Sequence, residues 1–209
     1  MNYDVVIVAS GKGQRAALGY NKVFYRMKDD KTVLEHAASL FVKDEDCKKI
    51  VIVTNPELFD EVFENEKITL TKGGKERKDS VYEGLLRCES EYVLIHDAAR
   101  PFLDERALQK LKEKVVTARA AVLGKIAVDT VKIIEGDRIV KTIDRNKVFL
   151  AETPQAFDRK LLLECYSRCE DIEFTDDVSL AESLGYEVSI VIDEYDNRKL
   201  TRQEDFEGI

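Results

Sequence analysis

Short apolar runs alternate with amphipathic stretches along most of the chain. The runs are rich in valine and isoleucine, which is typical of strands that are buried on both faces of a sheet. They lie at Val5–Ala9, Ile50–Thr54, Tyr92–Ile95, Ala120–Ile126 and Glu187–Ile192. Helical periodicity separates them, at Thr32–Val42, Pro56–Asn65, Asp79–Cys88 and Asp104–Ala118. This alternation predicts an α/β fold with a mostly parallel sheet.

The pattern changes in the segment DTVKIIEGDRIVKTIDR, which covers residues 129–145. It reads as two strands around the turn residues 135–137, and it predicts an inserted β-hairpin arm at about 131–150. An arm of this kind often contacts a second subunit, so we expect it to serve dimerisation. Further helices are expected near Asp158–Cys169 and Asp177–Leu184, and a short one from Arg202. No linker or repeat interrupts the pattern, which predicts one domain over residues 1–209.

Composition narrows the class of partner. The 209 residues carry a net charge of −8, which argues against a nucleic-acid partner. A small anionic substrate would therefore need local clusters of lysine and arginine. No leader-like segment or run of membrane-spanning length is recognised, and four cysteines with two histidines favour reduced thiols over a zinc site. We expect a cytoplasmic protein that does not bind a membrane.

Such clusters do follow the predicted strands. In open parallel sheets, ligands bind at the carboxyl ends of the strands. Polar and glycine-rich segments follow at or near those ends, at residues 11–22, 73–77, 96–101, 129–130 and 196–199. Cations from distant parts of an acidic chain therefore converge on one edge of the sheet, which predicts the site there.

The loop at residues 9–15 (ASGKGQR) is of a type that binds phosphate. Through Ala16 it fits G-x-G-x-x-A, the dinucleotide fingerprint of dehydrogenases, but no acid ends the second strand to bind a ribose. The Walker string G-x-x-x-x-G-K-[ST] is absent. Arg15 and Lys22 suit the neutralisation of a nucleotide triphosphate by side chains as well as by backbone N–H groups.

Seven strings, in chain order, resemble the motifs of the 2-C-methyl-D-erythritol 4-phosphate cytidylyltransferase family. They are ASGKGQR with a lysine seven residues later, GGKERKDSVYEGL, HDAARPF, DTVK, DRNKVFLAETPQAF, TDD and NRKLT, and they span about residues 3 to 206. The resemblance implies a Rossmann-like nucleotidyltransferase fold. It also implies transfer of a cytidylyl group from CTP to 2-C-methyl-D-erythritol 4-phosphate, with release of pyrophosphate, in non-mevalonate isoprenoid synthesis.

The resemblance assigns roles to individual residues. The catalytic cations would be Arg15, Lys22 and Lys199. The nucleotide would be bound by Ala9, Ser10, Gly11, Gly13, Gly74, Ser80 and Ala98. The polyol phosphate would be bound by Asp97, Arg100, Thr130, Thr153 and Arg145, the last reaching into the neighbouring subunit's site in a homodimer. Magnesium would be held mainly through the CTP phosphates, without assigned protein ligands.

The chemistry of this reaction needs few specialised groups. The substrate phosphate is already an anionic nucleophile, so positioning and electrostatic stabilisation carry most of the catalysis and no general base is required. His96 is therefore interpreted as a structural histidine whose ring bonds a backbone group beside Asp97. Asp97 could hold a substrate hydroxyl or help to position the metal-bound nucleotide, and the sequence does not separate the two roles.

Several positions depart from the usual motifs, namely Ser10, Asn21, Val23, Glu152 and Leu200. Asn21 and Val23 flank Lys22 and leave its placement open. Three alternatives remain at this stage: a ribitol-5-phosphate cytidylyltransferase, a nucleotide-binding regulator without catalysis, and an NAD-dependent dehydrogenase. HDAARP and TDD favour methylerythritol over ribitol.

Overall fold

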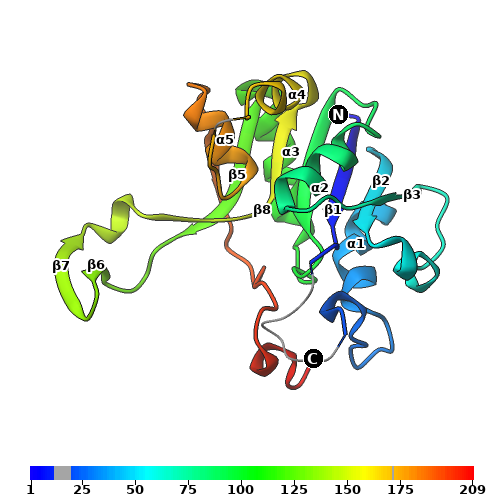
Figure 1. The fold of residues 1–209 in the computed structure, drawn as a ribbon, viewed down its shortest axis with the longest axis horizontal. Coiled ribbons are helices and arrows are strands. Elements are labelled where there is room, and N and C mark those ends of the chain that lie inside the picture. The colour runs from blue at the N-terminus through cyan, green and yellow to red at the C-terminus, as the bar shows by residue number, and fades with distance from the viewer. Residues whose placement is uncertain (12–19, 171) are drawn as a thin grey trace.

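The computed structural model of the chain describes residues 1–11, 20–170 and 172–209. Its strands are β1 (Tyr3–Val8), β2 (Cys47–Thr54), β3 (Ile68–Lys72), β4 (Tyr92–Asp97), β5 (Ala120–Ile126), β6 (Val131–Glu135), β7 (Arg138–Ile143), β8 (Phe149–Asp158) and β9 (Ser189–Ile192). Its α-helices are α1 (Val33–Lys43), α2 (Arg77–Leu85), α3 (Glu105–Ala118), α4 (Arg159–Ser167) and α5 (Asp177–Ser183). Figure 1 shows a central sheet with helices around it and a hairpin that projects from the body.

The central sheet of the described residues has seven strands in the order β3-β2-β1-β4-β8-β5-β9. All neighbouring pairs are parallel except that β8 runs antiparallel to both β4 and β5. In the β1–β4 register Val8 lies opposite Asp97, so the two strands end side by side. This register brings the loop after β1 next to the segment that follows β4. The predicted fold class, an α/β fold with a mostly parallel sheet and a separate hairpin, is confirmed.

Helices cover both faces of the sheet. Because successive strand residues point to opposite faces, Val5 and Ile7 of β1 pack with α1 and α3, whereas Val6 packs with α2, α4 and α5. The strands carry apolar residues on both faces because both faces are buried, as expected for a sheet between two layers of helices. The site is left at the strand ends, where no helix covers the sheet.

Local signals account for the helix starts. Thr32 caps α1 and accepts a hydrogen bond from the backbone N–H of Glu35, whose carboxylate bonds back to the Thr32 N–H at 2.6 Å. This is the capping box that the sequence pattern contains. Asp104 caps α3 in a similar way through the Arg106 N–H at 2.8 Å.

Some predicted elements are wrong in kind or extent. The predicted helix at Pro56–Asn65 is a 3-10 helix, η3 (Pro56–Glu61), and the helix expected from Arg202 is a 3-10 helix, η5 (Gln203–Phe206). None of the side chains of η3 is buried, and in η5 only Phe206 is, so the core does not hold either segment as a longer α-helix. Strands β3 and β8 were not predicted as strands. Two other 3-10 helices are η2 (Lys22–Phe24) and η4 (Arg145–Lys147).

Strands β6 and β7 form the arm, an antiparallel two-stranded hairpin outside the central sheet. Gly136 occupies its turn with φ of +59°, a left-handed conformation that favours glycine. The arm projects from the body on the left of Figure 1. Its apolar side chains are largely exposed, with relative exposures of 66% for Ile134, 65% for Ile139 and 60% for Val140.

Among the described residues, no helix is long and apolar enough to cross a membrane.

Candidate active site

A cleft of about 620 Å³ opens at the carboxyl ends of β1 and β4. Its walls come from the loop after β1, from η2, from the glycine loop before α2 (residues 73–74), and from the C-terminal segment that follows β9. The lining residues are Val8, Ala9, Ser10, Gly11, Asn21, Lys22, Val23, Asn55, Gly74, Lys75, Glu76, Arg77, Ser80, Asp97, Ala99 and Lys199. Segments nearly two hundred residues apart therefore meet at the edge where the sequence places the site.

Most of the predicted site residues with described positions lie in or directly behind this cleft. Those that line it are Ala9, Ser10, Gly11, Lys22, Gly74, Ser80, Asp97 and Lys199. Ala98, Arg100 and Thr153 lie behind it; Ala98 is fully buried, and its neighbour Ala99 lines the cleft instead. Thr130 and Arg145 are exposed at the base of the arm. Gly13 and Arg15 lie outside the described residues.

Asn21 ties the end of β1 to Lys22. Its side-chain amide donates to the Ala9 carbonyl at 2.9 Å, and its oxygen caps η2 through the Val23 N–H at 3.3 Å. Lys22 begins η2 and donates from Nζ to the carbonyl of Leu200. Lys22 therefore lines the cleft despite the unusual residues on either side of it.

The glycine loop leaves no room for larger side chains. A Cβ added at Gly74 would lie 2.1 Å from Cβ of Asp79, and one at Gly73 would lie 2.6 Å from Cβ of Ser10. The Ser80 hydroxyl accepts from the Gly74 N–H at 3.1 Å and donates to the Glu76 carbonyl at 3.1 Å. With its hydrogen used in this way, Ser80 must accept from the Ser10 hydroxyl at 3.0 Å. These bonds join the loop after β1 to the start of α2.

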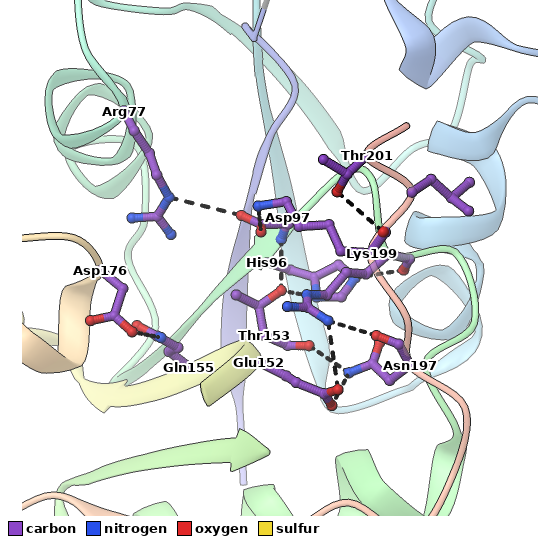
Figure 2. A network of polar contacts seen from close by, with 12 residues as sticks. Arg77, His96, Asp97, Glu152, Thr153, Gln155, Asp176, Asn197, Lys199 and Thr201 are labelled. Carbon is purple, nitrogen blue, oxygen red and sulfur yellow. Dashed lines mark hydrogen bonds and ion pairs between the residues drawn. The ribbon is translucent and has the colours of Figure 1, made fainter. Parts of the chain in front are cut away.

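Asp97 is the acidic centre of the cleft. Its Oδ2 accepts from Nζ of Lys199 at 2.6 Å, and its Oδ1 lies 3.8 Å from Nε of Arg77 (Figure 2). Burial alone would raise the pKa of Asp97, but the charges of Lys199, Arg77 and Arg100 outweigh it and lower this pKa to about 2. Asp97 is therefore ionised at neutral pH and acts as a hydrogen-bond acceptor.

His96 lies behind Asp97 and is fully buried. Its Nε2 is 3.2 Å from the Arg100 carbonyl, which can only accept, so Nε2 carries the proton. Nδ1 then accepts from the Thr153 hydroxyl at 3.2 Å, and the Thr153 oxygen in turn accepts from the Asp97 N–H at 3.0 Å. Burial lowers the pKa of His96 to about 4, so the ring is neutral at physiological pH. This arrangement supports the structural interpretation of His96.

Arg100 interacts with two buried polar residues beside the cleft, Asn197 and Glu152. Its Nη1 donates to the Asn197 carbonyl at 2.7 Å and lies 3.8 Å from Oε1 of Glu152. Asn197 donates from its amide to the Thr153 carbonyl at 2.9 Å. Burial raises the pKa of Glu152, against the lowering effect of Arg100 and Lys125. Glu152, one of the unusual positions, thus provides Arg100 with an acidic partner.

Comparison with known proteins identifies the family. The sequence profile of 2-C-methyl-D-erythritol 4-phosphate cytidylyltransferases matches residues 3–208, nearly the whole chain. The chain belongs to this cytidylyltransferase family. The resemblance to the methylerythritol family seen in the sequence motifs is confirmed.

Relatives and solved structures agree with this assignment. The cytidylyltransferase of this name from Bacillus velezensis is 41% identical, over 98% of this chain and 93% of its own. That from Halalkalibacterium halodurans is 38% identical, over 98% and 94%. The crystal structure of the enzyme from Francisella tularensis superposes with a TM-score of 0.85 at 28% identity, over 99% of this chain and 97% of the other. The fold is thus that of the family's solved members.

Arg77 lies in this cleft, although no role was assigned to it from the sequence motifs. It lines the cleft, faces Asp97, and donates from Nη1 to Oδ2 of Asp177 at 2.9 Å. Arg77 and Asp177 both lie in motif strings, GGKER and TDD, which were quoted without a role for either residue. The pairing joins positions 100 residues apart in the chain, so no local pattern could reveal it.

Proposed function

We propose that the cleft transfers the cytidylyl group of CTP to 2-C-methyl-D-erythritol 4-phosphate, with residues 1–209 acting as one catalytic domain. The observation that carries this proposal is the meeting of the Ala9–Gly11 loop, Lys22 and the glycine loop with the Asp97–Lys199 pair in one cleft. In the reaction, a phosphate oxygen of the polyol phosphate attacks the α-phosphorus of CTP. The bond from that phosphorus to the β-phosphate oxygen breaks, and pyrophosphate leaves.

The nucleotide end of the cleft is built from backbone. The Ala9–Gly11 loop and the Gly73–Gly74 loop bring main-chain groups close together, and Ser80 joins them. We propose that this end binds CTP, with the cytosine against Gly74 and Ser80 because a narrow wall of backbone excludes the larger purines. Lys22 would contact the phosphates, together with Arg15 from outside the described residues.

Lys199 lines the cleft beside Asp97. Its ammonium uses one donor on Asp97, which leaves further donors for a phosphate oxygen. We assign to Lys199 the orientation of the attacking phosphate, and to Asp97 contact with the polyol part of the substrate. Arg100 and Thr153 lie directly behind Asp97 and support its position.

The residues present fit a role for magnesium that depends on the nucleotide. Among the described residues, no group of three His, Cys, Asp or Glu side chains could hold a metal ion, and two carboxylate residues, Glu76 and Asp97, line the cleft. Magnesium commonly binds through substrate phosphates and one or two carboxylates, and such a set is present once CTP is bound. When bound, the ion would neutralise charge on the phosphates, and Glu76 and Asp97 are the lining carboxylates that could approach it.

We propose that the protein acts as a homodimer through the arm. The exposed Ile134, Ile139 and Val140 provide an apolar surface, and Arg145 at its base donates to the Val128 carbonyl at 2.6 Å. Burial of these exposed apolar side chains by a second chain would be favourable. Arg145 of one chain would then contact the substrate in its partner.

We place the protein in the cytoplasm. Its four cysteine side chains are free thiols, and three of them are buried. Burial raises the pKa of Cys47 to about 12, so this thiol is unreactive. Free structural thiols are typical of reducing compartments.

The direct test of the function is pyrophosphate release from each of CTP, UTP, ATP and GTP with each of methylerythritol phosphate and ribitol 5-phosphate. We expect turnover with CTP and methylerythritol phosphate, and at most weak turnover with either purine nucleotide. Equal turnover with ATP and CTP would contradict the assignment of the nucleotide pocket. Preference for ribitol 5-phosphate would contradict the assignment of the acceptor.

Subunit mixing tests the shared site. Arg145→Ala and Lys22→Ala should each lose activity alone, while hybrid dimers contain one site with both residues intact. Since half of the dimers in an equal mixture are hybrids, about a quarter of the wild-type activity should return. The absence of any return after verified subunit exchange would show that Arg145 does not complete the partner's site.

A further inference from the structure

The motifs TPQ and TDD build a support beneath Arg77. Gln155 of β8 donates from Nε2 to Oδ2 of Asp176 at 2.8 Å, and its Oε1 accepts from the Val178 N–H at 3.1 Å. Figure 2 shows Gln155 and Asp176 below Arg77, on the side of Asp97 away from Lys199. These two bonds anchor the first residues of α5 to the central sheet. They fix the position of Asp177, which lies between Asp176 and Val178.

Asp177 is a fully buried carboxylate with both oxygens engaged. Oδ1 accepts from the Tyr166 hydroxyl at 2.7 Å, and Oδ2 accepts from Nη1 of Arg77 at 2.9 Å. The ring of Tyr166 contacts two other aromatic rings. It stacks on Tyr82 with 5.5 Å between ring centroids and is edge-on to Phe174 with 6.1 Å between centroids. A buried carboxylate is costly unless it is paired and hydrogen-bonded, so Asp177 strongly favours one position of the Arg77 guanidinium.

The guanidinium in that position also faces Asp97. Nε of Arg77 is 3.8 Å from Oδ1 of Asp97, while Lys199 takes the other oxygen, Oδ2, at 2.6 Å. The positive charge of Arg77 is thus shared by two carboxylates, Asp97 and Asp177, and it is not a surplus cation for the phosphates of CTP. Other charged or titratable groups that face Asp97 are Arg100 and the neutral ring of His96.

We propose that Arg77 is a positioning residue, which Asp177 holds in place so that Oδ1 of Asp97 can accept a hydroxyl of the polyol phosphate. The inference rests on the proposed function. At 3.8 Å, Arg77 attracts Oδ1 without a hydrogen bond, so the lone pairs of that oxygen stay available to a substrate hydroxyl. Lys199 fixes Oδ2, and the two cations together set the plane of the carboxylate. Arg77 acts on the substrate through Asp97.

The experiment compares the charge-removing variant Arg77→Met with the charge-neutral pair Arg77→Met/Asp177→Asn in the full-length protein. Removing Arg77 alone leaves Asp177 buried without its partner, which lowers stability; removing both charges restores much of it. A merely structural role therefore predicts that activity returns in the double variant. The positioning role predicts that activity stays low, because Asp97 still lacks Arg77. Arg87→Met, just after the same helix and exposed, is the matched control.

Kinetics then locate the effect. We expect Arg77→Met and the double variant to lose about 10- to 100-fold in kcat/KM for methylerythritol phosphate, with the Kd of CTP changed less than about threefold. Deoxy analogues of the substrate, each lacking one hydroxyl, should include one whose kcat/KM is nearly equal in wild type and variant, since its partner on Asp97 is already missing. Wild type and Arg87→Met should agree throughout.

Three results would overturn the inference. These are recovery of activity in the double variant, a loss of CTP affinity as large as the loss in kcat/KM for the polyol phosphate, and an equal effect of Arg77→Met on every deoxy analogue. Failure of the wild type to use methylerythritol phosphate would instead count against the proposed function. The two failures are therefore distinguishable.

Discussion

The cleft and the arm both depart from the usual distribution of side chains. Ionisable side chains are buried at the cleft, whereas large apolar side chains are exposed on the arm. At the cleft, Asp177 and His96 are fully buried, and Asp97 is nearly so. On the arm, Ile134 and Ile139 are about two-thirds exposed. Buried ionisable groups and contiguous exposed large apolar groups are each uncommon in soluble proteins.

The two departures are compensated differently. Each buried charge beneath the cleft has a partner in the same chain, as Asp177 has Arg77 and Tyr166. The apolar side chains of the arm have no such cover, because β6 and β7 pair with each other outside the central sheet. The charged cluster is thus paired within one chain, whereas the apolar side chains of the arm would be covered only in the dimer that we propose. Changes in the cleft should therefore alter catalysis or pH dependence, and changes in the arm should alter association.

The largest effect is expected at Lys22. If its charge stabilises the phosphates more as the α-phosphorus is attacked, Lys22→Ala should reduce kcat by about 100-fold or more, roughly 3 kcal/mol, with a much smaller change in CTP affinity. Lys28→Ala is a matched control, since Lys28 also donates to a carbonyl of the C-terminal segment, that of Gly208, but lies outside the cleft. Steady-state kinetics measure both. Near-normal turnover of Lys22→Ala at saturating substrate would remove Lys22 from the mechanism.

The next effect is the response of stability to acid. His96 is buried and neutral with a pKa of about 4, whereas an unfolded histidine has its usual pKa of 6.5. Between these values the unfolded state binds more protons, so the free energy of unfolding falls as the pH drops from 6.5 to 4, by about 3 kcal/mol in all. The low pKa of Asp97 has its effect at lower pH, between 3.8 and about 2.

Substitution tests how much of this acid sensitivity His96 causes. His96→Gln should flatten the stability profile between pH 6.5 and 4, as measured by urea unfolding at each pH. His36→Gln is the control, because His36 lies near the surface and pairs with Asp29 at 2.9 Å. A profile equally steep in His96→Gln and wild type would mean that other groups cause the acid sensitivity.

The smallest effect is expected on the arm, and it should appear in association alone. Ile139→Asp should weaken the proposed dimer at least about tenfold, since burial of one isoleucine contributes about 1.5 kcal/mol or more. The unfolding free energy of the separated chain should change by less than about 0.5 kcal/mol, because the side chain is already exposed. Val116→Asp, at an exposed position of α3, provides the comparison. Analytical ultracentrifugation would reveal an unchanged dimer if the arm is not the interface.

The sequence predicted those elements whose pattern is local. The parallel strands β1, β2 and β4 each contain a continuous apolar run, and the Thr32–Glu35 box marks the start of α1. Strand β8 was missed because FLAETPQAFD contains a proline and polar residues, and its apolar positions do not alternate. It is held as a strand by β4 and β5 on either side, a constraint that exists only in the folded sheet.

In the site, too, some residues could be predicted from local sequence patterns and others could not. The loop after β1 and the Asp97–Lys199 region were predicted because polar residues follow buried strands, and such ends meet at one edge of a parallel sheet. Arg77 was not assigned because its importance depends on Asp177 and Asp97, which three separate elements bring together. Asn21 was judged a departure that left Lys22 uncertain, and its bond to Ala9 becomes visible only in three dimensions.

The antiparallel strand β8 has a consequence for the order in which a growing chain can fold. It lies between β4 and β5, yet it follows both in the sequence, so these strands cannot be bridged until the ribosome has added residues 149–158. Until then β4 presents an open edge, and the arm emerges before the sheet is closed. Most described residues of the proposed nucleotide side, from Ala9 to Ser80, belong to the part synthesised first. The proposed polyol side, which needs Thr153 and Lys199, is completed only after these later residues have been added.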